Sequence, residues 1–140
     1  MIIRKANPSE IDWINNKYKE VDFTPSNLTN DYNFIAEIDT IPCGLGRLTK
    51  IDNNNIELGG IYVFDSHRGL GVAGKIVNHL LSKANPGVNI WCLPFKHLES
   101  FYIKLGFQIS KNNQAIPDKV VSKYEWCNNT YKEEVLLLFQ

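Results

Sequence analysis

Residues 59–74 read GGIYVFDSHRGLGVAG, an apolar run that stops at Asp65-Ser66 and continues through a glycine-rich loop with one arginine. The residues after this loop have the apolar spacing of an amphipathic helix. Such a loop directs consecutive backbone N–H groups toward one point beside the positive end of a helix. A phosphate or pyrophosphate is the natural ligand of that arrangement. The alternative is an ordinary strand–turn–helix whose glycines only permit a tight turn.

The whole chain has the composition expected of a single globular domain spanning residues 1–140. Of its 140 residues, 44% are hydrophobic and 21% are charged, which suffices for a core without disulfides. Fifteen basic and fifteen acidic residues cancel, so no overall field favours nucleic acid or an anionic membrane. No apolar run is long enough for a bilayer, and no signal region follows Met1. We therefore expect a cytoplasmic monomer or homodimer with no nucleic-acid or membrane partner.

The three cysteines are expected to be free thiols. Cys43, Cys92 and Cys127 are odd in number and scattered, and none is spaced as a metal ligand with another cysteine or a histidine. We therefore expect no metal site. Cys92 could be a nucleophile, but its strand is apolar and has no adjacent cation that would favour a thiolate. Buried packing is the favoured interpretation of Cys92.

The order of the predicted elements indicates an α/β protein with a mixed sheet. An antiparallel meander of three strands leads through one crossover helix to an almost wholly apolar strand, which suits a position covered on both faces. Gly59-Gly60 inside a strand predicts a bulge or a close approach of another backbone. Residues 111–132 have weak periodicity and receive no assignment. The predicted elements are strands 2–5, 32–38, 41–51, 56–64, 88–93, 107–109 and 135–139, and helices starting near Asn7-Pro8, Val72 and Pro94.

Three blocks of the sequence, in this order, resemble the GNAT-type N-acetyltransferase superfamily. The first is FIAE (34–37) followed by GLGRL (44–48), the second is VFDSHRGLGVA (63–73), and the third is FYIKLGF (101–107). The resemblance covers roughly residues 1–110 and the final strand. It implies the GNAT acyl-CoA N-acyltransferase fold: an antiparallel meander, then two parallel strands (56–64 and 88–93) that splay apart, flanked by helices.

The resemblance also implies acetyl-CoA as the cosubstrate. The backbone of Ile61, Tyr62 and Val63 would pair with the amides of pantetheine, nearly as a missing strand would. The loop would hold the pyrophosphate mainly through its N–H groups. Its residues are Arg68, Gly69, Leu70, Gly71, Val72, Ala73 and Gly74. One position departs from the family pattern, because Phe95 stands where many members have an asparagine that contacts pantetheine.

Two catalytic residues follow from the same resemblance. Tyr102 would protonate the departing thiolate, and a core aromatic with a satisfied hydroxyl is the alternative. Glu57 would take the proton of the acceptor amine, which is largely protonated at neutral pH; a solvent-facing strand glutamate is the alternative. A backbone N–H near Val63 would polarise the thioester carbonyl. Acetyl transfer would then be direct, in a ternary complex. Arg47 is expected to be only a charge on the surface of its strand.

The leading functional hypothesis is an acetyl-CoA-dependent N-acetyltransferase (an acyltransferase of EC class 2.3.1) whose acceptor is an unidentified primary amine. A non-catalytic acyl-CoA sensor or regulatory module of the same fold is the alternative, favoured by Phe95 and opposed by Tyr102 and Glu57. A nucleotide-binding protein is a third hypothesis, but the chain has no recognisable Mg²⁺ or base site. The glycines match neither the Rossmann fingerprint nor the Gly-Lys-Ser/Thr ending of a P-loop.

Overall fold

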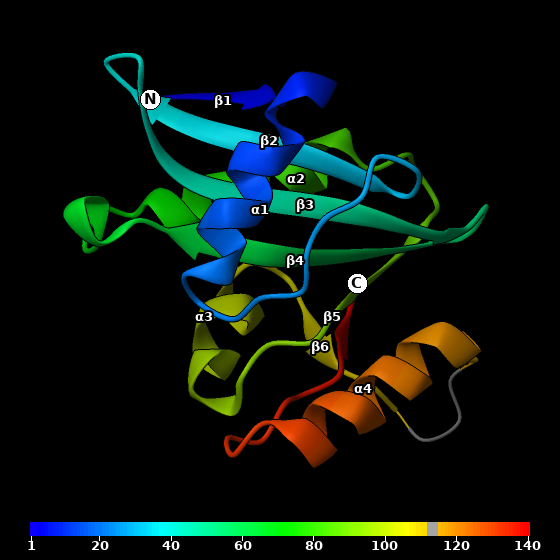
Figure 1. Cartoon of the computed structure of the whole chain (residues 1–140). Helices are drawn as coiled ribbons and strands as arrows, with labels where there is room; N and C mark the ends of the chain where they lie inside the picture. Colours follow the sequence, from blue (N-terminus) through cyan, green and yellow to red (C-terminus); the bar gives the residue numbers. More distant parts are fainter. Residues whose placement is uncertain (112–114) are drawn as a thin grey trace. The chain divides into compact units, whose positions relative to one another are not determined.

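The computed structural model describes residues 1–111 and 115–140. Within these residues, seven strands form a hydrogen-bonded sheet in the order β1-β2-β3-β4-β5-β7-β6, accompanied by four α-helices (Figure 1). The strands are β1 (Ile2–Lys5), β2 (Asp31–Ile38), β3 (Ile41–Asp52), β4 (Asn55–Val63), β5 (Asn89–Cys92), β6 (Gln108–Ile109) and β7 (Leu138–Phe139). The helices are α1 (Ile11–Lys19), α2 (Val72–Lys83), α3 (Glu99–Lys104) and α4 (Asp118–Thr130).

The pairing of the strands confirms the mixed α/β class. β1, β2 and β3 pair antiparallel, β4 and β5 pair parallel, and β7 pairs antiparallel with both β5 and β6. The parallel ladder runs from Asn55–Asn89 to Leu58–Cys92, where β5 ends. Because β4 continues to Val63, its last residues extend beyond the paired segment, as expected for splayed strands.

The chain divides into two compact units, which we describe separately. The first comprises residues 1–49 and 60–84, and the second comprises residues 50–59 and 85–140. Two of the three boundaries between them fall inside strands, at the end of β3 and in the middle of β4, and the third follows α2. That residues 1–140 behave as one domain stays a prediction.

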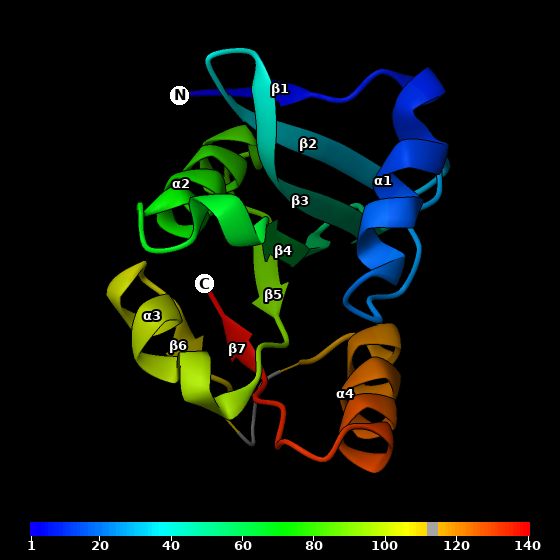
Figure 2. The same ribbon diagram turned by 60° about the vertical axis from the view of Figure 1, so that its left-hand side comes forward.

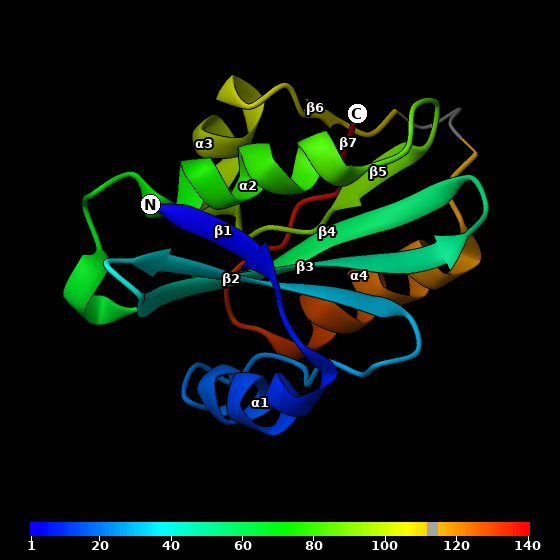
Figure 3. The ribbon, with the colours of Figure 1, turned by 90° about the horizontal axis from the view of Figure 1, so that it is seen from above.

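In the first unit, α1 and α2 cover opposite faces of the strands (Figure 3). The face beneath α1 is closed by a core of buried residues, namely Ile14, Tyr18, Ile35 and Leu45. On the other face, α2 packs so closely that a Cβ added to Gly46 would lie 2.7 Å from Ile76 Cγ2 and 3.0 Å from Leu80 Cδ1. The start of α1 follows the predicted cap, since the Asn7 N–H donates to Glu10 Oε1 at 2.9 Å.

In the second unit, α3 and α4 lie on either side of β5, β7 and β6 (Figure 2). The helix expected from Pro94 begins only at Glu99, after a short 3₁₀ turn (Lys96–Leu98). Pro94 and Phe95 stay extended because they pair with the chain's last segment: the Leu136 N–H donates to the Pro94 carbonyl at 2.8 Å, and Phe95 bridges Val135. The same pairing replaces the start of the strand expected at 135–139, so β7 is shorter than predicted.

α4 lies in the segment that received no assignment. Only Val120 and Cys127 are buried among the residues of this helix, so its apolar stripe is too sparse to predict an amphipathic helix. Asn128 fixes the end of α4, because its side chain accepts the Val135 N–H at 2.8 Å and donates to the Val135 carbonyl at 3.1 Å. Residues 112–114, within the unassigned segment, lie outside the described part of the chain.

Candidate functional site

The glycine-rich loop of the first unit has the backbone of a turn that only glycine adopts easily. After a short 3₁₀ turn (Asp65–His67), Gly69 and Gly71 have φ of +80° and +75°. A Cβ at either glycine would meet nothing within 4 Å, so conformation and not crowding requires glycine there. The loop therefore leaves open space beside its own backbone.

This open space lies at the start of a twelve-residue helix. Gly71 is the N-cap of α2, provides no capping side chain, and is followed by no acidic residue in the first turn. The first helical hydrogen bond of the described backbone at this end joins the Lys75 N–H to the Gly71 carbonyl, at 3.3 Å. The N–H groups of Val72, Ala73 and Gly74 thus have no acceptor within the helix. An anion placed there would accept them and meet the positive end of the helix dipole.

The charged side chains of the loop are at the surface. Arg68 is 64% exposed and its Nε lies 3.2 Å from Asp65 Oδ1, itself 89% exposed. An exposed pair of this kind is worth little, so Arg68 can turn toward an incoming anion at small cost. The loop residues thus fit a pyrophosphate: backbone donors, an unshielded helix end and one mobile cation.

The end of β4 is irregular, as Gly59-Gly60 predicted. Gly60 has φ of +61°, and a Cβ there would lie 2.6 Å from the Tyr18 hydroxyl. The close neighbour is thus a side chain and not another backbone; the Tyr18 hydroxyl donates to the Gly60 carbonyl at 2.8 Å. Beyond this residue, the Phe64 N–H donates to the Cys43 carbonyl of the neighbouring segment at 2.9 Å. Because N–H directions alternate along a strand, the N–H of Val63 faces the opposite edge of β4.

Arg47, interpreted from sequence as a surface charge on its strand, is buried. It is 6% exposed, and its guanidinium lies 4.8 Å from the centre of the Tyr18 ring. Its Nη1 donates to the Ser26 hydroxyl at 2.7 Å and to the Thr24 carbonyl at 2.8 Å. The surface interpretation was therefore wrong: this arginine ties the segment after α1 to the strands, and a stacked, hydrogen-bonded guanidinium tolerates burial.

In the second unit, Tyr102 and Cys92 form a buried pair. Tyr102 on α3 is 5% exposed and Cys92 on β5 is 2% exposed, and their side chains are hydrogen-bonded to each other. Burial raises the pKa of the Tyr102 phenol well above its usual value, and the Cys92 sulfur raises it further. Tyr102 is therefore a neutral hydroxyl with a proton to give at any ordinary pH. The phenyl rings of Phe101 and Phe107 pack edge-on against it.

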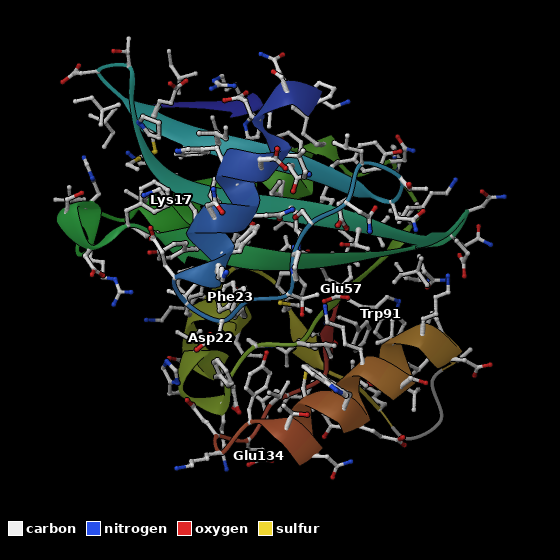
Figure 4. The ribbon with its side chains drawn as sticks, in the orientation of Figure 1. Lys17, Asp22, Phe23, Glu57, Trp91 and Glu134 are labelled. Carbon is white, nitrogen blue, oxygen red and sulfur yellow. The ribbon has the colours of Figure 1, made fainter. Side chains whose placement is uncertain are left out.

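Glu57 is buried and not solvent-facing. It is 5% exposed on the part of β4 that pairs with β5, opposite Trp91 (Figure 4). Its Oε2 accepts a hydrogen bond from Lys123 Nζ at 2.7 Å. The solvent-facing alternative is therefore wrong for Glu57, and a carboxylate held in this way needs the cation that accompanies it.

Both predicted catalytic residues influence the pKa of the same thiol. Burial raises the pKa of Cys92, and the nearby Glu57 carboxylate raises it further, while the hydrogen bond with Tyr102 acts in the opposite direction. The result is a protonated thiol, which confirms the packing interpretation and opposes a nucleophilic role. Tyr102 thus contacts Cys92 from α3, whereas Glu57 lies opposite Trp91 in the sheet and contacts Lys123 of α4.

Sequence reasoning missed Lys123. It lies in the segment that received no assignment, although the spacing contained a signal: Val120, Lys123 and Cys127 fall on one face of a helix. A lysine that lies on the same helix face as two buried residues indicates an acidic side chain close enough to pair with its charge. The charge of Lys123 lowers and that of Glu57 raises the pKa of the Cys127 thiol, whose net shift is upward because of burial.

Phe95, which departs from the family pattern, has a packing role in this chain. Besides its bridge to Val135, its ring lies edge-on to Tyr131 at 5.3 Å and stacks on His97 at 6.2 Å. His97 in turn is hydrogen-bonded to Glu133 at the surface, and the bond lowers the pKa of Glu133. Across the described residues, no three His, Cys, Asp or Glu side chains form a cluster that could hold a metal.

The mixed sheet with its parallel β4–β5 pair has the fold of an acetyltransferase domain. The profile of the acetyltransferase (GNAT) domain matches residues 29–109. The chain belongs to the GNAT acetyltransferase family. No curated protein matches it in sequence.

Solved structures show the same fold at low sequence identity. An aminoglycoside 6'-N-acetyltransferase complexed with coenzyme A matches with a TM-score of 0.72 and 15% identity, over 100% of this chain and 96% of that chain. Naa50 of Arabidopsis thaliana, in complex with the bisubstrate analogue CoA-Ac-MVNAL, matches with a TM-score of 0.69 and 15% identity, over 99% of this chain and 97% of that chain. N-acetylglutamate synthase of Neisseria gonorrhoeae, complexed with coenzyme A and N-acetyl-glutamate, matches with a TM-score of 0.69 and 18% identity. The match covers 97% of this chain but only 34% of that chain. In residues 1–111 and 115–140, no helix is both long and apolar enough to cross a membrane.

Proposed function

We propose that this chain is an acetyl-CoA-dependent N-acetyltransferase that moves the acetyl group directly to a primary amine in a ternary complex. The observation that carries the proposal is the burial of both candidate catalytic side chains in the second unit: Glu57 on β4 is 5% exposed, and Tyr102 on α3 is 5% exposed as a neutral phenol. The family membership supplies the donor class. The solved relatives, which were crystallised with coenzyme A, support it.

The loop before α2 would bind the donor's pyrophosphate. The N–H groups from Val72 to Gly74 donate to it, and Arg68 adds a mobile positive charge. The N–H of Val63 faces the free edge of β4. It is suited to donate a hydrogen bond to the oxygen of the thioester carbonyl, where negative charge develops during the reaction. By the same alternation, Ile61 presents its backbone to the edge that Val63 faces and would pair with the pantetheine amides, whereas the backbone of Tyr62 faces the other edge.

The chemistry assigns one proton transfer to each catalytic residue. Glu57 takes a proton from the acceptor ammonium, so that a neutral amine attacks the thioester carbonyl. As the C–S bond breaks, Tyr102 gives its proton to the departing sulfur, and the nitrogen loses its second proton to solvent. Solvent then reprotonates the phenol and receives the proton held by Glu57. The balance is one primary ammonium and one thioester converted to one amide, one thiol and one released proton.

Calorimetry with acetyl-CoA, coenzyme A and ATP, followed by thiol release across a panel of amines, tests this proposal. The panel should contain an aminoglycoside, glutamate and a peptide N-terminus, the amine types of the solved relatives. We expect binding of both acyl-CoA and CoA, weaker binding of ATP, and thiol release with at least one amine. A chain that binds no coenzyme A would refute the proposal.

A non-catalytic acyl-CoA sensor is the second candidate, and the surroundings of Phe95 favour it. The ring of Phe95 is committed to Tyr131 and His97, so this position offers pantetheine no amide contact. A sensor would bind acetyl-CoA in calorimetry yet release no thiol with any amine. Thiol release with any amine of the panel would show that the chain is an enzyme and not a non-catalytic sensor.

A further inference from the structure

The side chain of Lys123 is a primary amine held against the proposed catalytic base. Its Nζ donates to Glu57 Oε2 at 2.7 Å, from a helix that sequence analysis did not assign. A general base must lie within about 2.6–3.2 Å of the group whose proton it takes. Lys123 therefore already has the contact with Glu57 that an acceptor ammonium would need.

The charged and titratable groups around this amine belong to one cluster of the second unit. Glu57 and Lys123 both act on the Cys127 thiol, and Glu57 also acts on Cys92, to which Tyr102 is hydrogen-bonded. Lys123 of α4 and Glu57 of β4 thus both act on the buried Cys127 thiol. An external acceptor amine and Lys123 would compete for the same carboxylate, that of Glu57.

The exposure of the two partners suits a reacting amine. The Glu57 side chain is 7% exposed, whereas that of Lys123 is 38% exposed. The lysine can therefore be reached from solvent while its proton points at a buried acceptor. A purely structural pair would be served at least as well by arginine, whose guanidinium can bond both carboxylate oxygens; here one Nζ–Oε2 bond is made.

We propose that Lys123 is an internal acetyl acceptor, so that the chain acetylates itself at this residue; this rests on the proposed function. Glu57 takes one proton from the Lys123 ammonium, Nζ forms a bond to the acetyl carbonyl carbon, and the C–S bond of acetyl-CoA breaks. The nitrogen loses a second proton to solvent as the amide forms, and the sulfur leaves with a proton from Tyr102. Solvent then restores the Tyr102 proton and receives the one held by Glu57. The products are N-acetyl-Lys123, coenzyme A and one proton.

Acetylation would change the site itself. The amide formed on Lys123 has no charge, so Glu57 loses the cation that neutralises it and becomes available to an external ammonium. Self-acetylation would then raise the rate of later turnover with other amines. Lys123→Arg, which cannot be acetylated, would keep a permanent cation on Glu57.

The test is peptide mass spectrometry of the full chain during incubation with acetyl-CoA, with Lys119 as the internal control. Lys119 lies one turn earlier on α4 and is exposed, so it reports the chemical background. We expect Lys123 to gain an acetyl group at least about tenfold faster than Lys119, the low end of what a positioned base contributes. The rate constant should not depend on protein concentration, because the reaction is internal.

Two variants keep the result decisive. Glu57→Gln should lower the Lys123 rate to that of Lys119, and Lys123→Arg should remove one acetyl group from the intact mass while preserving the ion pair. Acetylation of Lys123 no faster than of Lys119, in a chain that binds acetyl-CoA and acetylates an external amine, would overturn self-acetylation alone. Absent binding of acetyl-CoA would instead overturn the proposed function.

Discussion

The surroundings of a side chain could be predicted from the sequence where a motif contains the residue. They could not be predicted where contacts with distant segments of the chain determine its burial and partners. Tyr102 follows from the FYIKLGF block and is buried beside Cys92 as a neutral phenol. Glu57 was placed on the correct strand, but strand alternation alone could not tell a buried carboxylate from an exposed one. Lys123, which pairs with it, lies 66 residues away in sequence. Arg47 was misjudged for the same reason, since Ser26 and the Tyr18 ring shelter it from outside its strand.

Replacement of Tyr102 by phenylalanine should slow acetyl transfer while sparing binding of the donor. The ring and its packing on Phe101 and Phe107 remain, so only the proton for the thiolate and the bond to Cys92 are lost. General acid catalysis contributes about 10²- to 10⁴-fold. We expect kcat to fall by about that factor, measured by thiol release, with the calorimetric Kd for coenzyme A within about twofold of the wild type.

The pH profile checks the same assignment. Because burial and Cys92 raise the pKa of Tyr102 above its ordinary value, the phenol keeps its proton through the alkaline range. The wild-type kcat should therefore show no loss from phenol ionisation up to about pH 10, the ordinary tyrosine value. An alkaline loss of rate below that pH that disappears in Tyr102→Phe would contradict a raised pKa.

Elements with a strong period or a strong end signal were predictable, whereas α4 was not. α2 has four buried residues in its apolar stripe and starts at the loop that the glycines predicted, and α1 starts at its Asn-Pro-Ser-Glu cap. α4 buries Val120 and Cys127 alone, so its formation depends on Asn128 and the ion pair of Lys123. Those contacts are tertiary, so the apolar period of α4 alone does not predict the helix.

Gly74→Ala should separate the stability of α2 from its binding of an anion. Gly74 is inside the helix, and an added Cβ would meet nothing within 4 Å. Alanine should therefore raise the free energy of unfolding by about 0.5–1 kcal/mol, measured in urea. The same Cβ would enter the space beside the loop's N–H groups, and loss of one such bond to a charged ligand weakens coenzyme A binding by roughly tenfold.

Gly71→Ala is the matched control for that experiment. Its φ of +75° strains any residue with a Cβ by about 1–2 kcal/mol, so this variant should lose both stability and affinity. If Gly74→Ala left the affinity for coenzyme A unchanged, the start of α2 would not be the pyrophosphate site.

The N-terminal cap of α1 should make the protein's stability depend on acid pH. Glu10 accepts hydrogen bonds from both guanidinium Nη atoms of Arg4 and from the Asn7 N–H, and these contacts lower the pKa of Glu10 to about 2. A carboxyl whose folded pKa lies below its unfolded value stabilises the fold above the unfolded pKa and loses that contribution as pH falls. The contribution of Glu10 should thus be present above about pH 4.5 and disappear toward about pH 2.

Urea unfolding of the wild type and Glu10→Gln across this range measures the effect. The wild type should be the more stable by on the order of 1 kcal/mol at neutral pH, and the difference should shrink as pH falls from 4.5 to 2. A difference that stayed constant with pH would show that Glu10 does not titrate in this window.

For the whole molecule, the shared strands predict one cooperative unfolding transition. Two of the three boundaries between the compact units pass through strands, one at the end of β3 and one in the middle of β4, so each unit contains part of both strands. Loss of structure in one unit would therefore fray strands that the other needs. Calorimetry should give equal calorimetric and van't Hoff enthalpies, and two resolved transitions would show independent domains.

Acetyl-CoA should shift that single transition to higher temperature, since a ligand that binds only the folded chain stabilises all of it. At one hundred times the Kd, the gain is about 2.7 kcal/mol. For a chain of this size that corresponds to an increase in Tm of roughly 5–10 °C. ATP at the same concentration should shift Tm less, because it lacks the pantetheine arm that the edge of β4 would pair with. Tyr102→Phe should keep the full shift and Gly71→Ala should lose most of it; an equal shift with ATP would mean that the loop binds phosphates without selecting an acyl donor.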